Sequence, residues 1–240
     1  MIFISWSMDY CKCFTLDEKL LLMQVYNFSD NHSIYSKFLS EIRDQVIQTD
    51  SLRFRTNLER LGELSAYEIS KQLNYKKMDV VTSLGTAKMD VINEPIVLAT
   101  ILRAGLPLHQ GLLNYFDSAE NCFISAYRKH TNNEDFEVEI EYLSSPDLQG
   151  KTVFLSDPML ATGKSMVLAY KALLKNGNPK KIHIVSVIGS KEGVDYVKSN
   201  FPSNTSIWIG AIDSDMTSES YIVPGLGDAG DLSFGSKLDS

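Results

Sequence analysis

Residues 152–177, TVFLSDPMLATGKSMVLAYKALLKNG, contain a short loop whose residue types could hold a phosphate. Its middle, ATGKS, resembles the end of a nucleotide P-loop, which needs a glycine, four free positions and then Gly-Lys-Ser/Thr. Pro158 occupies the place of that first glycine, and proline fixes φ and lacks the N–H that a phosphate would need. A Walker A motif is therefore excluded. A strand, a loop of small residues and a helix N-terminus remain, and these present free N–H groups to an anion. An ordinary strand-to-helix turn would use the same residues.

A carboxylate stands beside this candidate anion site. Asp157 follows the apolar run of the strand and so lies at its carboxyl end. It would repel a phosphate unless it served another part of the ligand, and ribose hydroxyls are donors that suit a carboxylate acceptor. The pairing favours a sugar phosphate over a triphosphate. In the helix that follows, Ser165 is expected to cap the start and Gly177 to mark the end.

Two arginines follow other apolar runs. The run at 96–102 ends in Arg103, with Gly105 and Pro107 at the start of the expected next helix, and the run at 122–127 ends in Arg128. Arginines at neighbouring strand ends suit a pyrophosphate, because the guanidinium can form two parallel hydrogen bonds to it. Each arginine alone could equally form a surface ion pair.

The segment YIVPGLGDAGDLSFG, residues 221–235, is too rich in glycine to be a regular helix or strand. Glycine-rich backbone can lie flat against a small planar ligand and offer N–H and C=O groups to its edge. A glycine-rich surface tail is the alternative.

These motifs together resemble the phosphoribosyltransferases, from about Met23 to the end of the chain. DPMLATGKS is similar to the 5-phosphoribosyl 1-pyrophosphate (PRPP) loop of the uracil enzymes, with Lys164 where that family has a second glycine. ILRAGLP resembles their pyrophosphate loop, and residues 221–235 are almost identical to their uracil-binding hood. DMTSESY, just before the hood, departs from the family's usual Asn-Glu-His-Gly.

The resemblance implies transfer of phosphoribose from PRPP to uracil, giving UMP and pyrophosphate, with Mg²⁺ bound mainly through PRPP and with no metal ligands of the protein's own. The implied catalytic residues are Asp228, Arg103 and Arg128. The implied PRPP contacts are Arg103, Arg128, Asp157, Pro158, Met159, Leu160, Ala161, Thr162, Gly163, Lys164, Ser165 and Asp228. The implied uracil contacts are Ile222, Gly227, Asp228 and Ala229. A transferase for another base and a PRPP- or UMP-sensing regulator with little or no catalysis are the alternatives.

The elements that must position these residues follow from periodicity. Helices are expected over 33–48 and from Ser51 to about Leu73, and a β-hairpin around Gly85. Apolar runs at 96–102, 122–127, 136–143, 152–156, 182–188 and 206–212 alternate with helical patterns. This alternation predicts an α/β fold, a mostly parallel sheet flanked by helices, in which ligands bind at the carboxyl ends of the strands. By resemblance it is the type I phosphoribosyltransferase fold, with a C-terminal hood at about 213–240 and a protruding β-hairpin arm.

Composition sets the remaining expectations. The 240 residues carry a net charge of −7, which disfavours bulk electrostatic binding to nucleic acid. The length suits one domain over 23–240, with 1–22 as an N-terminal extension. Three cysteines without zinc-type spacing and no long apolar segment predict a cytoplasmic protein that binds no membrane. The exposed edges of the hairpin and the resemblance predict a homodimer or homotetramer, and the resemblance makes GTP a candidate effector.

Overall fold

The computed structural model describes residues 23–130 and 136–237. For the strand residues between 126 and 139 only the backbone is described. The proposed extension over 1–22, with Cys11 and Cys13, lies outside this range. In the described part of the chain, no helix combines the length and apolar character that crossing a bilayer requires.

One large sheet forms the centre of the molecule, with strand order β1-β10-β9-β7-β4-β5-β6 and a short strand β8 paired to β9. All these pairs are parallel except the antiparallel pair of β5 and β6. The strands are β1 (Gln24–Asn27), β4 (Ile96–Leu102), β5 (Glu120–His130), β6 (Phe136–Ser144), β7 (Thr152–Ser156), β8 (Met159–Leu160), β9 (Lys181–Ser190) and β10 (Thr205–Asp213). The expected mostly parallel α/β sheet is confirmed.

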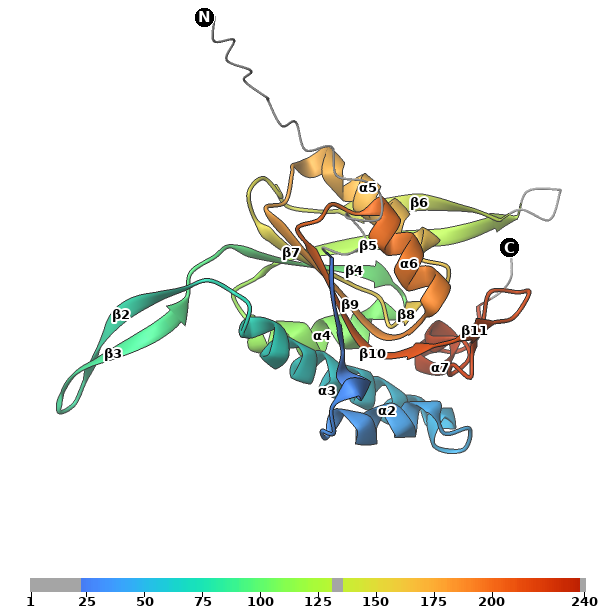
Figure 1. Ribbon diagram of the computed structural model, residues 1–240, viewed down its shortest axis with the longest axis horizontal. Coiled ribbons are helices and arrows are strands. Elements are labelled where there is room, and N and C mark those ends of the chain that lie inside the picture. The colour runs from blue at the N-terminus through green and yellow to red at the C-terminus, as the bar shows by residue number, and fades with distance from the viewer. Residues whose placement is uncertain (1–22, 131–135, 238–240) are drawn as a thin grey trace, which may run out of the picture.

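Helices cover both faces of this sheet (Figure 1). One face carries α2 (Tyr35–Arg43), α3 (Ser51–Ser70) and α4 (Gly105–Tyr115), and the other carries α5 (Lys164–Leu173) and α6 (Lys191–Asn200). Each face has its own apolar core. The first is built around the fully buried Phe54, Leu58 and Leu108, and the second around Met166, Val167 and Val197. The two cores exclude water from both faces of the sheet and hold in place the strand ends at which the candidate residues lie.

The predicted helix over 33–48 is shorter than expected. The helix α2 ends at Arg43, and a separate 3₁₀ turn covers Ile47–Thr49. The reason is the side chain of Asp44, whose Oδ1 accepts hydrogen bonds from the N–H groups of Val46 and Ile47 at 2.8 and 2.9 Å. This local bonding replaces the helical pattern, as is common for aspartate. The helix predicted from Ser51 is confirmed, with Asp50 as its N-cap.

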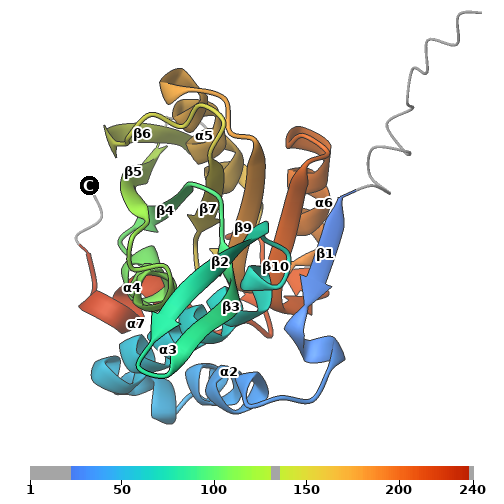
Figure 2. The same cartoon turned by 90° about the vertical axis from the view of Figure 1, so that its left-hand side faces the viewer.

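Two smaller sheets lie outside the core. The predicted hairpin is confirmed as β2 (Tyr75–Thr82) and β3 (Gly85–Ile92), and Figure 1 shows it projecting away from the body of the molecule. The other pair is β11 (Asp215–Met216) with β12 (Ile222–Val223), followed by α7 (Ala229–Phe234). This second group forms the hood, at the opposite end of the molecule from the hairpin. Figure 2, seen from the hairpin side, shows β6 and β1 at opposite edges of the large sheet.

Candidate active site

The candidate residues meet where the strand order reverses. From β4 the chain continues through α4 to β5 on one side, whereas β7 pairs with β4 on the other side and leads to β9 and β10. Arg103 directly follows β4, and Asp157 directly follows β7. In doubly wound sheets such a reversal opens a crevice at the carboxyl ends of the two strands, where ligands bind. The sheet topology therefore brings Arg103 and Asp157 to one crevice.

The phosphate loop connects β7 to α5. Gly163 is the N-cap of α5, with φ +74, a left-handed conformation that glycine adopts readily. The expectation that Ser165 caps this helix is wrong, because α5 already begins at Lys164 and has no side-chain cap. Lys164 is exposed, and its N–H donates to Thr162 Oγ1 at 3.4 Å. The next two N–H groups of α5, those of Ser165 and Met166, have no acceptor among the described residues and remain available to an anion. Gly177 ends the 3₁₀ turn after α5, as predicted.

The first half of the loop is bonded to β9. The Pro158 carbonyl accepts from the N–H groups of Val187 and Ile188 at 2.9 and 3.0 Å. Met159 and Leu160 form β8, and the Leu160 side chain is buried in the core. These contacts give Pro158 and Leu160 a packing role, which leaves Asp157 and residues 161–165 as the candidates for ligand contact in this loop.

Ser190 supports the same loop, and sequence reasoning missed it. Its hydroxyl donates to the Ala161 carbonyl at 2.6 Å and accepts from the Gly193 N–H at 2.8 Å, so it joins the loop to the N-terminus of α6. The signal in the sequence was only a serine after an apolar run, which is a common helix N-cap.

The Asp157 residue is half-buried at the end of β7. Burial raises its pKa to about 7, against the opposing effect of a hydrogen bond from the Met159 N–H, and the negative charge of Asp228 raises it further. Asp228, which starts α7, therefore acts electrostatically on Asp157 at the end of β7, although the two residues are far apart in the sequence. A ligand that donates hydrogen bonds to Asp157 would favour its charged form.

Arg103 reaches from the end of β4 to the hood. Its Nη2 donates to Asp231 Oδ1 at 3.0 Å and to the Gly235 carbonyl at 3.2 Å. The side chains of Arg103 and Asp231 are 40% and 36% exposed. The guanidinium is therefore at the crevice but engaged by the C-terminal part of the hood.

Arg128 lies within β5 rather than at its end, because β5 continues to His130 in its antiparallel pairing with β6. The last residue of β5 that pairs with β4 is Ser125, opposite Leu102. Arg128 thus stands three positions beyond the end of β4. The direction of its side chain lies outside the described residues.

The hood contains a helix that the sequence did not predict. The segment 221–235 was expected to contain no regular structure, but residues 222–223 form β12 and residues 229–234 form α7. Asp228 begins this helix, since its Oδ1 accepts from the N–H groups of Gly230 and Asp231 at 2.8 and 3.0 Å. Its Oδ2 lies 3.6 Å from the Lys237 ammonium. One carboxylate oxygen of Asp228 is therefore used in capping and the other is not.

The hood is preceded by a tight turn at Ser220. Its φ is +66, which is uncommon for a residue other than glycine, and its N–H donates to the Thr217 carbonyl at 3.0 Å. Ser220 stands where the Asn-Glu-His-Gly motif of the uracil phosphoribosyltransferases has its glycine, directly before the tyrosine. The turn keeps a backbone conformation typical of glycine although a serine occupies the position.

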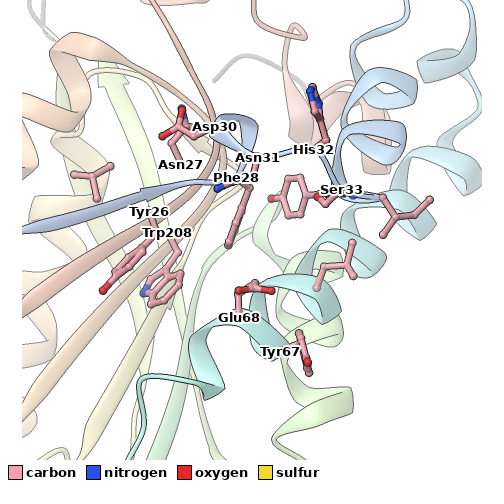
Figure 3. A pocket seen from close by; sticks show the side chains of 14 residues that line it. Tyr26, Asn27, Phe28, Asp30, Asn31, His32, Ser33, Tyr67, Glu68 and Trp208 are labelled. Carbon is pink, nitrogen blue, oxygen red and sulfur yellow. Dashed lines mark hydrogen bonds between the residues drawn. The ribbon is translucent and has the colours of Figure 1, made fainter.

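A cavity of about 530 Å³ lies elsewhere, between β1 and α3 (Figure 3). Stacked rings of Tyr26 and Trp208 form one wall, and Asp30 and Glu68 supply carboxylates. Of the residues predicted to contact PRPP or uracil, none lines it, and its described lining includes no lysine or arginine. This cavity therefore does not suit a polyphosphate.

Within residues 23–130 and 136–237, no three His, Cys, Asp or Glu side chains are grouped to hold a metal ion. The crevice offers two carboxylates, those of Asp157 and Asp228. Carboxylates are hard oxygen donors of the kind that Mg²⁺ accepts, and this ion commonly binds through one or two of them together with substrate phosphates. The residues present therefore fit an ion held mainly through a ligand's own oxygens.

Comparison with known proteins shows the family of this chain. The family model described as uracil phosphoribosyltransferase matches residues 29–236. A uracil phosphoribosyltransferase from Porphyromonas gingivalis is 56% identical over 216 residues, covering 90% of this chain and 100% of the relative. One from Thermococcus gammatolerans is 36% identical over 219 residues, covering 90% and 95%. The solved structure of a protein from Aquifex aeolicus matches with a TM-score of 0.79 and 30% identity, covering 90% of this chain and all of that one. The chain belongs to the uracil phosphoribosyltransferase family.

Proposed function

We propose that this enzyme transfers the 5-phosphoribosyl group of PRPP to uracil, giving UMP and pyrophosphate, a reaction of pyrimidine salvage. The observation that carries the proposal is the meeting of the phosphate loop, Arg103 and the hood at one switch point of the sheet. Family membership supports the same substrates.

The phosphate loop and Asp157 form the proposed PRPP site. The backbone N–H groups of residues 161–165, with the hydroxyls of Thr162 and Ser165, would hold the 5′-phosphate at the positive end of α5. Asp157 would accept hydrogen bonds from the ribose hydroxyls. Its half-buried position supports this role, because a hydrogen bond to a charged group is worth more where water is partly excluded.

Arg103 and Arg128 are the proposed pyrophosphate ligands. Arg103 follows β4, and Arg128 lies in the neighbouring strand β5, three positions beyond the last residue that pairs with β4. A guanidinium matches two phosphate oxygens at once. When bound through PRPP, Mg²⁺ would supply charge neutralisation on the pyrophosphate. The arginines would add to it as negative charge develops on the leaving group, the kind of stabilisation that is often the largest catalytic contribution.

The turn from Ile222 to Ala229 is the proposed uracil site, with Ile222, Gly227, Asp228 and Ala229 in contact. Ile222 and Ala229 are buried in the core, so their side chains hold in place the backbone whose polar groups would bond the edge of the base. The Asp228 Oδ2 oxygen, which is free of the helix cap, is the oxygen that we place closest to uracil N1 and the anomeric carbon.

These positions support a reaction without a covalent enzyme intermediate. The bond between C1 of ribose and the pyrophosphate oxygen breaks, and its electron pair leaves with pyrophosphate. The N1 electron pair of uracil forms the new bond to C1 from the opposite face, and the N1 proton is released. Asp157 and the phosphate loop orient the ribose throughout this exchange.

A panel of bases tests the proposal. With PRPP and Mg²⁺, uracil should be converted to UMP, whereas cytosine should react at least about 10⁴-fold less efficiently in kcat/KM. Cytosine carries an amine where uracil has an acceptor, and a site built on hydrogen bonds leaves that mismatch unpaired. Adenine and hypoxanthine should not react. Nucleotide formation is followed by chromatography of the products.

Other outcomes of the panel would identify the alternatives. Comparable turnover of hypoxanthine would make the protein a transferase for another base. UMP or PRPP binding without turnover of any base would make it a regulator. In that case, filter binding of RNA across a salt series would test for a nucleic-acid partner, which the net charge of −7 disfavours.

The protruding hairpin supports a homo-oligomer, at least a dimer. At its tip Leu84 is 98% exposed and Val81 is 85% exposed, and such apolar side chains favour burial against a second copy. A tetramer and a GTP effector stay predictions from the resemblance, and the cytoplasmic location stays a prediction from composition.

Light scattering tests the oligomer. At micromolar concentration the unaltered protein should have at least the mass of a dimer. Val81→Asp should weaken the association by roughly 10–100-fold, because burying one apolar side chain is worth about 1.5–3 kcal/mol. Val46→Asp is the matched control, since Val46 is 80% exposed but lies outside the hairpin. A monomer for the unaltered protein would refute the assembly.

A further inference from the structure

Behind the proposed uracil turn lies an ion pair that no sequence motif indicates. Arg43 is the last residue of α2, and Asp213 is the last residue of β10. Arg43 Nη1 donates to Asp213 Oδ2 at 2.8 Å and Nη2 donates to Asp213 Oδ1 at 2.9 Å. Only 21% of the Arg43 side chain and 9% of the Asp213 side chain are exposed. A two-bond arginine–carboxylate pair with this burial has a fixed geometry.

The same pair holds the backbone of the hood at Gly225. Arg43 Nη1 donates to the Gly225 carbonyl at 3.1 Å, and the Gly225 N–H donates to Asp213 Oδ2 at 3.0 Å. Both backbone polar groups of Gly225, its N–H and its carbonyl, are therefore hydrogen-bonded to the Arg43–Asp213 pair. Gly225 has φ +56, and a Cβ there would lie 2.0 Å from the Ile222 carbonyl oxygen. No other residue could form so tight a turn at this place.

A second side chain bonds the next residue of the turn. With its amide nitrogen toward the carbonyls around it, Gln48 donates to the carbonyls of Ile42 and Leu226 at 2.9 Å each. Leu226 is itself buried in the core beside α2 and α3. The turn is therefore attached to the body at two successive residues, Gly225 and Leu226, both between the proposed uracil contacts Ile222 and Gly227.

This attachment sets where the base-binding backbone lies relative to the sheet. Asp213 cannot move without β10, whose end pairs with Ser190 of β9, the residue that supports the phosphate loop. Ser190 and Asp213 are register partners, so one pair of neighbouring strand ends locates the PRPP loop on one side and the uracil turn on the other. Bond formation between two substrates depends on such fixed spacing.

We propose that Arg43 and Asp213 are positioning residues that set the affinity for uracil by holding the 222–227 turn, an inference that rests on the proposed uracil site. Neither residue needs to touch the base. The pair acts through Gly225, whose displacement would misplace the N–H and C=O groups that bond the edge of uracil.

Steady-state kinetics of Arg43→Met and Asp213→Asn test the proposal. Each should raise the KM for uracil about tenfold or more and change the KM for PRPP by less than about twofold, because only one of the two substrate sites loses its support. Arg43→Lys keeps the charge but not the two-bond geometry, so it should have an intermediate KM for uracil. The double variant should be little worse than either single variant if the two side chains act as one unit.

Arg53→Met provides the matched control. Arg53 also forms a two-bond pair with a carboxylate, Glu41, at 2.9 Å for both bonds, and it also joins α2 to its surroundings. It forms no described contact with the hood. Its loss should leave the KM for uracil unchanged, and thermal melts of all variants show whether each protein is folded.

The outcomes separate the possible failures. If Arg43→Met lowers only kcat or the folded fraction, with the KM for uracil unaltered, the pair is merely structural and the inference is wrong. Asp228→Asn, which keeps the helix cap but removes charge from the turn, tests the uracil site itself. A changed KM for uracil in Asp228→Asn beside an unchanged one in Arg43→Met would refute the positioning role alone. Unchanged values in both would refute the uracil site.

Discussion

Replacing Asp157 with asparagine is expected to lower kcat/KM for PRPP by about 10²-fold. The substitution removes the charged acceptor for the ribose hydroxyls, and hydrogen bonds to a charged group are worth about 1.5–3 kcal/mol. The shape of the side chain and its place after β7 stay nearly the same. The loss should therefore appear in steady-state kinetics with PRPP varied, without loss of the fold.

The pH dependence should identify the same group. Burial raises the pKa of the Asp157 carboxyl group to about 7 in the free protein. At lower pH the group is protonated and cannot accept hydrogen bonds from both ribose hydroxyls. The ratio of kcat/KM between the unaltered protein and Asp157→Asn should rise with pH up to about 7 and be constant above it. Using this ratio cancels the ionisation of PRPP itself. A ratio that is constant from acid to alkaline pH would contradict the assignment.

Lys164→Gly is the comparison variant within the same loop. Lys164 is exposed and its backbone N–H, rather than its side chain, belongs to the proposed phosphate site. Glycine would restore the usual loop of the family and should change the affinity for PRPP only a few-fold in either direction. An inactive Lys164→Gly beside a nearly normal Asp157→Asn would mean that the loop binds its phosphate through the lysine.

Replacing Arg103 with methionine should also have a large effect, an approximately 10²-fold loss in kcat/KM for PRPP. The substitution removes two hydrogen bonds and a positive charge from the proposed pyrophosphate site while keeping a side chain of similar length. In the structure this guanidinium is engaged by Asp231 and the Gly235 carbonyl, so it must exchange these partners for pyrophosphate.

Asp231→Asn tests that exchange, because it should act in the opposite direction. Removing the competing carboxylate should lower the KM for PRPP about two- to fivefold, the scale of a partly exposed ion pair. Kinetics of both variants with PRPP varied give the answer. If Asp231→Asn instead raised this KM as much as Arg103→Met does, then Asp231 would hold Arg103 in its working position rather than compete for it.

Local residue patterns predicted the parts of the fold that depend on short-range order. The strands at 96–102 and 152–156 match β4 and β7 to the residue, since continuous apolar runs specify strands buried on both faces. The hairpin around Gly85 and the start of α3 at Ser51 also depend on adjacent residues, and both are confirmed. The errors were local as well. Asp44 ended α2 early, and Gly163 rather than Ser165 began α5.

The sequence by itself determined which residues could bind an anion, a ribose and a base, because loop chemistry follows from residue type and spacing. Only the tertiary structure decided how these parts are held together. Arg43 and Asp213 are 170 residues apart, and Arg103 and Asp231 are 128 apart. The spacing of apolar residues along the sequence does not predict such pairs. They form only when helix packing and strand order bring distant segments to one edge of the sheet. The raised pKa of Asp157 has the same origin, because burial is a property of the folded chain.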